Sequence, residues 1–208
     1  MMGTVHRLSL PDQELLLEKL GIFKISGRDK SGRPILRIIG KFFPARIVSA
    51  DVVKKYLEEK ILPELGKRPF VVVYVHTDVQ RSENLPGMSA LRSVCDAVPA
   101  DVKESAEAVY FLHPGLQARL FLAFFGRFLF GGGLYGKVRY VNRLSYLWEQ
   151  VRMKEVEIPD FVYDHDEELE ESGNHRVMES GMEGDYARVY GGRAADQPVS
   201  TYSMRCIS

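Results

Sequence analysis

Cysteine is scarce in this chain of 208 residues, which contains only Cys95 and Cys206. Two cysteines cannot build the framework of several disulfides that small secreted domains use. The amino-terminal residues also contain no hydrophobic signal core followed by a cleavage site. We therefore predict a reducing, cytoplasmic location, with peripheral contact to a membrane left open.

The chain also lacks an apolar run long enough to cross a bilayer. The main run, Gly115 to Phe130, would form a helix of roughly 24 Å, whereas the hydrocarbon core of a bilayer is about 30 Å thick. Arg119 and Arg127 interrupt this run. We expect it to be a helix of a folded domain and not a membrane span.

The chain has no excess charge of either sign, but its charges are unevenly distributed. Residues 1–163 contain 24 Lys and Arg against 18 Asp and Glu, whereas residues 164–208 contain 4 against 10. The cations of the body form no stripe interleaved with aromatic residues, so we expect no nucleic-acid partner. The basic body is compatible with an anionic membrane surface, and residues 170–208 are predicted to be a disordered acidic tail.

Short apolar segments between turn residues predict strands that alternate with helices. The run Phe70–Val75 is continuous and β-branched, which is typical of a strand buried on both faces. Ala108–Leu112 predicts a second buried strand, and Lys137–Asn142 a half-exposed one. The other predicted elements are strands at Ile22–Ile25 and Ile35–Ile39, and helices at Pro11–Leu20, from Ser49 to Pro63, at Pro86–Val98 and at Leu144–Val151. This order favours an α/β fold with a mixed, mostly parallel sheet flanked by helices.

The helix predicted at Gly115–Phe130 has an unusually wide apolar arc. At about 100° per residue its leucines and phenylalanines cover roughly 200°, about twice the stripe of an ordinary surface helix. Such a helix needs apolar material on more than one side, which could be protein, a membrane or a bound lipid. Gly131, Gly132 and Gly133 follow it and predict a flexible joint at its end.

Three patterns suggest chemistry but do not have the context that the chemistry needs. Gly131–Gly136 satisfies G-x-G-x-x-G, yet a helix precedes it and a strand follows, which reverses the order of a phosphate loop. His76 and His113 follow predicted buried strands, but no metal-binding motif accompanies them, so they are interpreted as hydrogen-bonded structural histidines. The acidic residues Asp166–Glu168 and Glu170–Glu171 are interpreted as a solvated helix end. We predict no catalysis, no metal and no cofactor.

Several short segments follow one another in a specific order across most of the chain. They are Gly27-Arg28-Asp29 with Gly32-Arg33-Pro34, then Val72–His76, Tyr110–Pro114, the apolar helix, Lys137–Asn142 with Leu144 and Leu147, and Ile158–Val162. In this order and spacing the chain resembles the CRAL-TRIO lipid-binding domain. It is most similar to the divergent, BCH-like branch found in Rho GTPase-activating proteins and in the ganglioside-induced differentiation-associated macro-domain protein. Residues 28–169 would form this domain, and residues 1–27 a short helix and strand before it.

The resemblance implies a hydrophobic cavity that holds one phospholipid, such as a phosphoinositide, under a gate helix. By position the gate helix is Gly115–Phe130. Its implied lipid contacts are Leu116, Leu120, Phe121, Phe124, Phe125 and Phe128. Candidate contacts with phosphate or a membrane surface are Arg119, Arg127, Lys137 and Arg139, and the candidate hinge is Gly131, Gly132 and Gly133. An apolar cavity of several hundred Å³ beside Phe121 and Phe125 would favour this function.

Other functions stay open on the sequence alone. The same aromatic residues could fill an ordinary core, which would need no ligand. The resembling branch also implies an interaction module that binds small GTPases or their regulators, with the acidic tail adjusting the choice of partner. A hydrolase that uses His76 or His113 has only the position of these residues in its favour.

Overall fold

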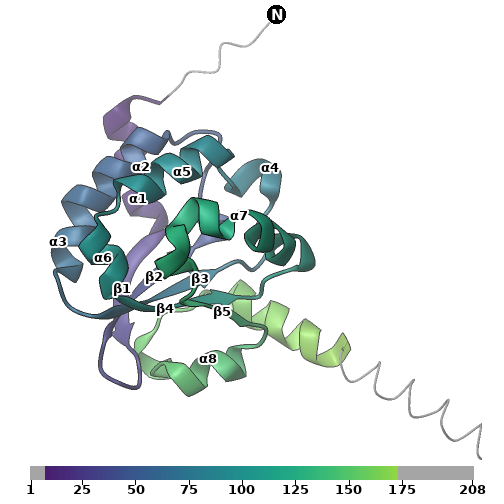
Figure 1. The fold of residues 1–208 in the computed structure, drawn as a ribbon. Coiled ribbons are helices and arrows are strands. Elements are labelled where there is room, and N and C mark those ends of the chain that lie inside the picture. Colours follow the sequence, from purple (N-terminus) through teal and green to yellow (C-terminus); the bar gives the residue numbers. More distant parts are fainter. Residues whose placement is uncertain (1–7, 173–208) are drawn as a thin grey trace, which may run out of the picture. The chain divides into compact units, whose positions relative to one another are not determined.

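The computed structural model of the chain describes residues 8–172. Its centre is a sheet of five strands in the order β1-β2-β3-β4-β5 (Figure 1). The strands are β1 (Phe23–Arg28), β2 (Pro34–Ile39), β3 (Phe70–Val75), β4 (Ala106–Leu112) and β5 (Val138–Val141). β1 runs antiparallel to β2, and the other neighbouring strands are parallel. The predicted α/β fold with a mixed, mostly parallel sheet is confirmed.

Strand β3 lies in the middle of the sheet, as its continuous apolar sequence predicts. It pairs with β4 over its whole length and with β2 over Val71–Val75. Val71, Val73 and Val75 point to one face and are completely buried, whereas Val72 and Tyr74 point to the other face and are half-buried. The two faces of the sheet are therefore covered to different extents.

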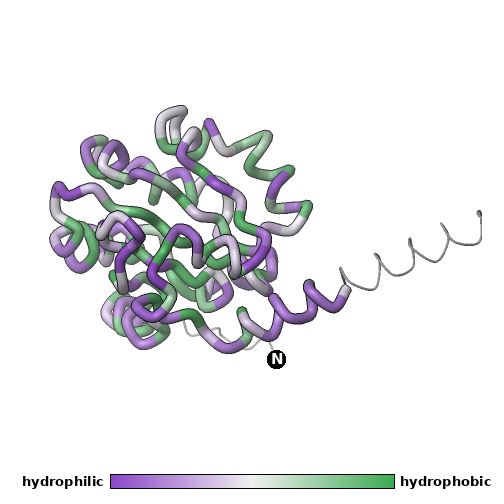
Figure 2. The backbone as a smooth tube through the Cα atoms, turned by 90° about the horizontal axis from the view of Figure 1, so that it is seen from below, coloured by the Kyte–Doolittle hydropathy of each residue, from purple (hydrophilic) through white to green (hydrophobic). Residues whose placement is uncertain are grey.

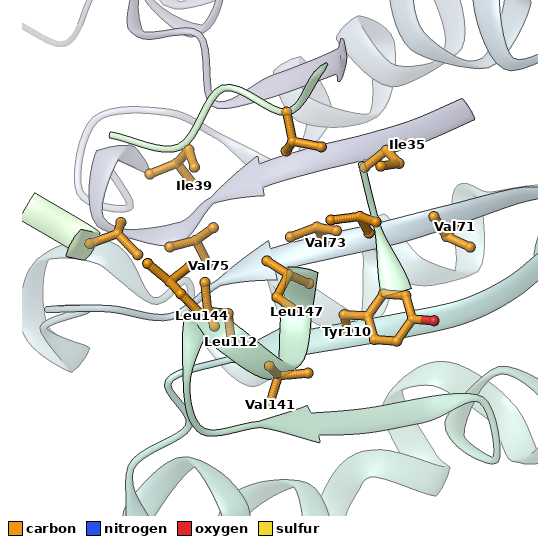
Figure 3. Close-up of a cluster of buried hydrophobic side chains, with 13 residues drawn as sticks. Ile35, Ile39, Val71, Val73, Val75, Tyr110, Leu112, Val141, Leu144 and Leu147 are labelled. Carbon is orange, nitrogen blue, oxygen red and sulfur yellow. The ribbon is translucent and has the colours of Figure 1, made fainter. Parts of the chain in front are cut away.

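One face of the sheet is covered by α8 (Leu144–Gln150) together with the helix that begins at residue 160. Leu144 and Leu147 point from α8 onto the strands (Figure 3). The buried residues of this face are Ile35, Ile39, Val71, Val73, Val75, Tyr110, Leu112, Val141, Leu144, Leu147, Val151, Val156 and Val162. Because these side chains are apolar and nearly inaccessible to water, this face is a conventional hydrophobic core.

The other helices lie on the opposite face (Figure 1). They are α1 (Leu10–Leu20), α2 (Ala50–Tyr56), a π-helical turn (Leu57–Ile61), α3 (Leu62–Leu65), α4 (Arg81–Asn84), α5 (Met88–Ala97), α6 (Ala100–Ser105) and α7 (Leu116–Tyr135). A second core forms where α1, α2, the π-helical turn and α3 meet the sheet, and Leu134 of α7 packs against it. Short 3-10 helices lie at Gly40–Phe42 and Met153–Glu155.

Several predicted boundaries are confirmed and others are corrected. The side chain of Ser49 accepts a hydrogen bond from the N–H of Val52, so the predicted cap of α2 is confirmed. Pro63 and then Gly66 are predicted to stop this helix, and it continues past Pro63 to Leu65 with Gly66 as its cap. Helices α4 and α6 have no signal in the sequence, because four or six residues are too few to show a helical period.

The helical residues 160–172 are mostly hydrophilic along their second half, as Figure 2 shows. Glu167, Glu168, Glu170 and Glu171 are exposed on this helix, as expected of solvated acidic residues. The predicted disordered tail lies, from residue 173 on, outside the described residues.

Helix α7 contains a sharp break at the first of its three consecutive glycines. Gly131 has φ 74° and ψ 158°, a region that side-chain-bearing residues avoid. The helix resumes at Gly132 and ends at Tyr135, so the predicted glycine joint lies inside the element and not at its end. A Cβ atom on Gly126 would lie 2.2 Å from the ring of Tyr135, which shows that the short second segment packs back against the first.

The turn between β1 and β2 is held by a buried carboxylate between two glycines. The carboxylate of Asp29 is buried and accepts hydrogen bonds from the backbone N–H and the guanidinium of Arg33, each at 2.7 Å. Gly27 and Gly32 flank it with φ 77° and 83°. A Cβ atom on Gly27 would lie 2.6 Å from the carbonyl oxygen of Glu155, whereas one on Gly32 would meet nothing within 4 Å.

We expect Gly27→Ala to destabilise the domain much more than Gly32→Ala. Both substitutions force alanine into a left-handed backbone conformation, which costs about 1 kcal/mol. Only Gly27→Ala adds a collision with a backbone, so its loss should reach about 3 kcal/mol or more. Urea denaturation of the two variants measures the difference, and equal losses would contradict the close packing of Gly27 on Glu155.

Candidate functional site

Helix α7 exposes most of the large apolar side chains that the sequence assigned to lipid contact. The exposed fractions are 72% for Leu116, 50% for Leu120, 78% for Phe124, 45% for Phe125 and 58% for Phe128. Phe121 is half-buried, and its ring lies 5.4 Å from that of Phe125. We call Leu116, Leu120, Phe124 and Phe128, which follow one another at four-residue spacing, the apolar stripe.

The rotation of α7 is set by its buried side. Leu122, Gly126 and Leu129 are its buried residues, and their spacing places them on one side of the helix. The apolar stripe therefore points away from them. An exposed apolar surface of this extent on one helix is unusual and marks a site of interaction with an apolar partner. Within residues 8–172, no helix combines the length and the apolarity needed to cross a bilayer.

The sheet face on the side of α7 carries four neighbouring rings, which we call the aromatic row. Tyr74 and His76 come from β3 and its end, Phe111 from β4, and Tyr140 from β5. The ring of Phe111 lies 4.9 Å from Tyr74, 5.1 Å from His76 and 6.2 Å from Tyr140. None of the four is buried as a whole residue, so the row forms a partly accessible, largely apolar surface.

His76 is the one titratable base in the aromatic row. Burial lowers the pKa of its ring to about 4, so the ring is neutral at pH 7. Its Nδ1 atom is inaccessible and has no hydrogen-bond partner among the described residues. The prediction of a hydrogen-bonded histidine is thus wrong for this atom, because the aromatic neighbours offer it no partner.

A pocket of about 570 Å³ lies between α5, α6 and the end of α7. A second pocket of about 670 Å³ lies between α5 and α7. Both include Phe128 and Arg92, and the guanidinium of Arg92 lies 4.0 Å from the ring centre of Phe128. Phe121 and Phe125 line neither of these two pockets, so the apolar cavity considered beside them remains a prediction.

The four cations assigned to phosphate or membrane contact do not lie together. Arg127 and Lys137 line the first pocket. Arg119 instead bonds the carbonyl oxygen of Pro114 and the side chain of Asn142, and its guanidinium lies 5.0 Å from the ring centre of Tyr140. Arg139 donates to the carbonyl oxygens of Gly136 and Val138 beside it in the chain.

The predicted hinge glycines border the same pocket. Gly131 and Gly133 line it. A Cβ atom on Gly131, Gly132 or Gly133 would meet nothing within 4 Å, so no close packing requires a glycine at any of them. Among these three positions, only Gly131 requires a glycine, because its φ is positive.

A polar network at the carboxyl ends of β3 and β4 had no clear signal in the sequence. His113 is buried, and its Nδ1 lies 2.8 Å from the hydroxyl of Thr77 while its Nε2 lies 3.1 Å from Asp166. Asp166 also accepts hydrogen bonds from the guanidinium of Arg143 and, at 2.8 Å, from the N–H of Leu144 at the start of α8. The hydrogen-bonded structural role predicted for His113 is confirmed, whereas Asp166 is not part of a solvated run.

The ionisation of this network follows from its contacts. Burial lowers the pKa of His113, although its hydrogen bond to Asp166 opposes this effect. Burial by itself would raise the pKa of Asp166, but the hydrogen bonds from Leu144, Arg143 and His113 bring that pKa below its usual value. Asp166 is therefore an anion that holds the start of α8 to the end of β4.

The network is arranged like a catalytic triad but cannot reach a substrate. Thr77 is only 1% exposed, so its hydroxyl has no access to a ligand. Within residues 8–172, no three His, Cys, Asp or Glu side chains are grouped so that they could hold a metal ion. The part of the domain that is both accessible and chemically distinctive is thus the surface formed by α7, the aromatic row and the two pockets.

We expect acidification to destabilise the domain through His76. The unfolded histidine titrates near 6.5 and the folded one at about 4, so the unfolded chain takes up the proton first as the pH falls. Stability is then lost between these two values. Between pH 7 and pH 5 the wild type should lose about 1–2 kcal/mol more than His76→Gln, the lower figure allowing for water beside the ring. Urea denaturation at both pH values measures this, and equal losses in the two proteins would contradict a neutral, buried His76.

Comparison with known proteins connects this architecture to one family. A family model described as a divergent CRAL/TRIO domain matches residues 32–168. The match includes strands β2 to β5, helix α7 and the Asp166 network.

Curated relatives agree with this match. Ganglioside-induced differentiation-associated protein 2 of Xenopus tropicalis is 30% identical over 141 residues, which cover 68% of this chain and 28% of that protein. Protein GDAP2 homolog of Drosophila melanogaster is 28% identical over 147 residues, 71% of this chain and 27% of that protein. The human ganglioside-induced differentiation-associated protein 2 is 26% identical over 141 residues, 68% of this chain and 28% of that protein. The chain thus spans less than a third of the length of these relatives, and it belongs to the divergent CRAL/TRIO domain family.

Proposed function

We propose that this domain is a non-catalytic lipid-binding and lipid-exchange module that holds one phospholipid, such as a phosphoinositide, under α7. The observation that carries the proposal is the exposure of the apolar stripe on α7 beside an aromatic row that is itself only partly covered. The contact between Arg119 of α7 and Tyr140 of the row brings the first turn of this helix beside the row. An acyl chain between them would remove both from water.

The free energy available from an acyl chain is large enough for this function. Each buried methylene contributes about 0.8 kcal/mol, so one long chain contributes of the order of 10 kcal/mol before the cost of ordering. The half-buried side chains that would meet it are Val72, Tyr74, Phe111 and Phe121. Specific hydrogen bonds to the lipid can therefore be few.

Gly131 divides α7 into a part that can move and a part that is fixed. The segment after it is held by Leu134 in the second core and by Tyr135 against Gly126. The segment before it contributes only three buried residues. Rotation about Gly131 would turn the apolar stripe toward the aromatic row, which is the motion that a gate requires.

A membrane surface is the second apolar partner that the proposal includes. The apolar stripe would enter the headgroup boundary, while Arg127 on the same helix would face anionic headgroups. The domain would then open where lipid is available. This peripheral contact is reversible, because the exposed side chains of a single helix bury little apolar area.

We expect the domain purified from cells to carry about one phospholipid per chain, measured by extraction and mass spectrometry. Leu120→Ser should reduce the uptake of fluorescent phosphatidylcholine about fivefold or more, because it removes apolar surface from the stripe. Leu15→Ser is the matched control, since Leu15 on α1 is 48% exposed and Leu120 is 50% exposed. An empty, folded wild type that takes up no labelled lipid would exclude the proposal.

We expect Gly131→Ala to slow lipid exchange, because alanine disfavours the observed break in α7, and with it the conformation that exposes the apolar stripe, by about 1–2 kcal/mol. This corresponds to a rate decrease of roughly five- to thirtyfold, measured by transfer between quenched and unquenched vesicles. Gly133→Ala is the control, since its neighbourhood is equally open and its φ is not positive. Equal rates for the two variants would show that Gly131 is not the hinge.

The exposed apolar stripe also supports a second candidate, a module that binds a small GTPase or a regulator of one. A protein partner would cover the stripe in place of a lipid or membrane. The two candidates differ in one outcome. If Leu120→Ser abolishes capture of the GTPase but leaves uptake and exchange of lipid unchanged, the interaction module is favoured.

A further inference from the structure

The pocket between α5, α6 and α7 is rich in positive charge. Its lining includes the cations Arg92, Lys103, Arg127 and Lys137, and the carboxylates Asp96 and Glu104. These side chains come from three helices and from the residue before β5. The charges gather here although the whole chain has a formal net charge of zero.

Two of these cations are already engaged within the protein. Arg92 forms an ion pair with Asp96 at 3.0 Å, which also neutralises that carboxylate. The ammonium of Lys137 donates to the backbone carbonyl oxygen of Glu104 at 2.8 Å. The side chains of Lys103 and Arg127 have neither a hydrogen bond nor an ion pair in the part of the chain that the structure describes.

We infer that this pocket binds a phosphate group, with Arg127 and Lys103 as its principal donors. A guanidinium offers paired N–H donors that match two phosphate oxygens, and an ammonium adds a compact charge. Lys137 would add its charge nearby. Glu104 is exposed and free to turn its carboxylate into water, so it does not prevent anion binding.

The two principal donors of this site lie on different helices, so a bound phosphate would affect the motion of α7. Arg127 lies before the break at Gly131, whereas Lys103 lies on α6, outside α7. A phosphate held by both would connect the segment that can move to a helix that does not take part in the motion. The site itself needs no lipid, and only the use of a lipid-borne phosphate rests on the proposed function.

The test compares two sources of phosphate with the intact chain. Inositol hexakisphosphate is titrated calorimetrically, and vesicles of phosphatidylcholine with or without phosphatidylinositol phosphate are tested by sedimentation. We expect Arg127→Gln and Lys103→Gln each to weaken binding about tenfold or more, the usual effect of losing a charge-assisted hydrogen bond. Lys60→Gln removes the same charge from an exposed residue outside the pocket and should change binding less than about twofold.

Each pattern of results has a defined meaning. Loss of binding to both probes, or to either one alone, in the pocket variants supports the site and identifies its source of phosphate. No binding by the wild type, or equal losses in Lys60→Gln and the pocket variants, overturns it. Uptake of fluorescent phosphatidylcholine by the same variants separates the two proposals. If the wild type binds phosphate but takes up no lipid, the phosphate site is supported and the proposed lipid-binding function is excluded.

Discussion

Strand β3 must be buried on both faces, and this requirement determines where the helices lie. On one face, Val71, Val73 and Val75 are completely covered by the layer that contains α8. On the other face, Val72 and Tyr74 remain half-buried, because the helices there are packed mainly against the β1–β2 side and against one another. The incompletely covered region is the one beside α7. The domain therefore has a conventional core on one side of its sheet, whereas apolar side chains on the other side are only partly covered.

Local sequence patterns predicted much of this arrangement. The continuous run in β3, the cap at Ser49 and the wide apolar arc of α7 each depend on neighbouring residues alone, so they can be recognised without the fold. The rotation of α7 about its own axis cannot be recognised in this way. It depends on Leu122 and Gly126 meeting the body of the domain, with Tyr135 filling the space that Gly126 leaves. The sequence could thus predict excess apolar surface, but not that the apolar stripe would face water.

The Asp166 network illustrates the same limit in polar residues. Asp166 is 53 residues from His113 and 23 residues from Arg143, and acidic residues follow it directly, so nothing local distinguishes it from a solvated carboxylate. In the fold it binds His113 and the start of α8. The carboxyl end of β4, where ligands of parallel sheets often bind, is thereby filled with protein side chains. The accessible part of the sheet is therefore its face beside α7.

An apolar surface and a cationic pocket meet at Gly131, and this proximity matters because the two would contribute different parts of binding. Burial of an acyl chain provides most of the free energy but distinguishes headgroups poorly, whereas a phosphate site adds little free energy and selects the headgroup. Both act on the segment of α7 that precedes Gly131. Suppose that a bound phosphate favours the closed conformation of that segment over the open one by some factor. Linkage then requires that the open conformation binds phosphate more weakly than the closed one by the same factor. Headgroup recognition and lipid retention would then be coupled through this segment, because Phe128 of the apolar stripe also lines the cationic pocket.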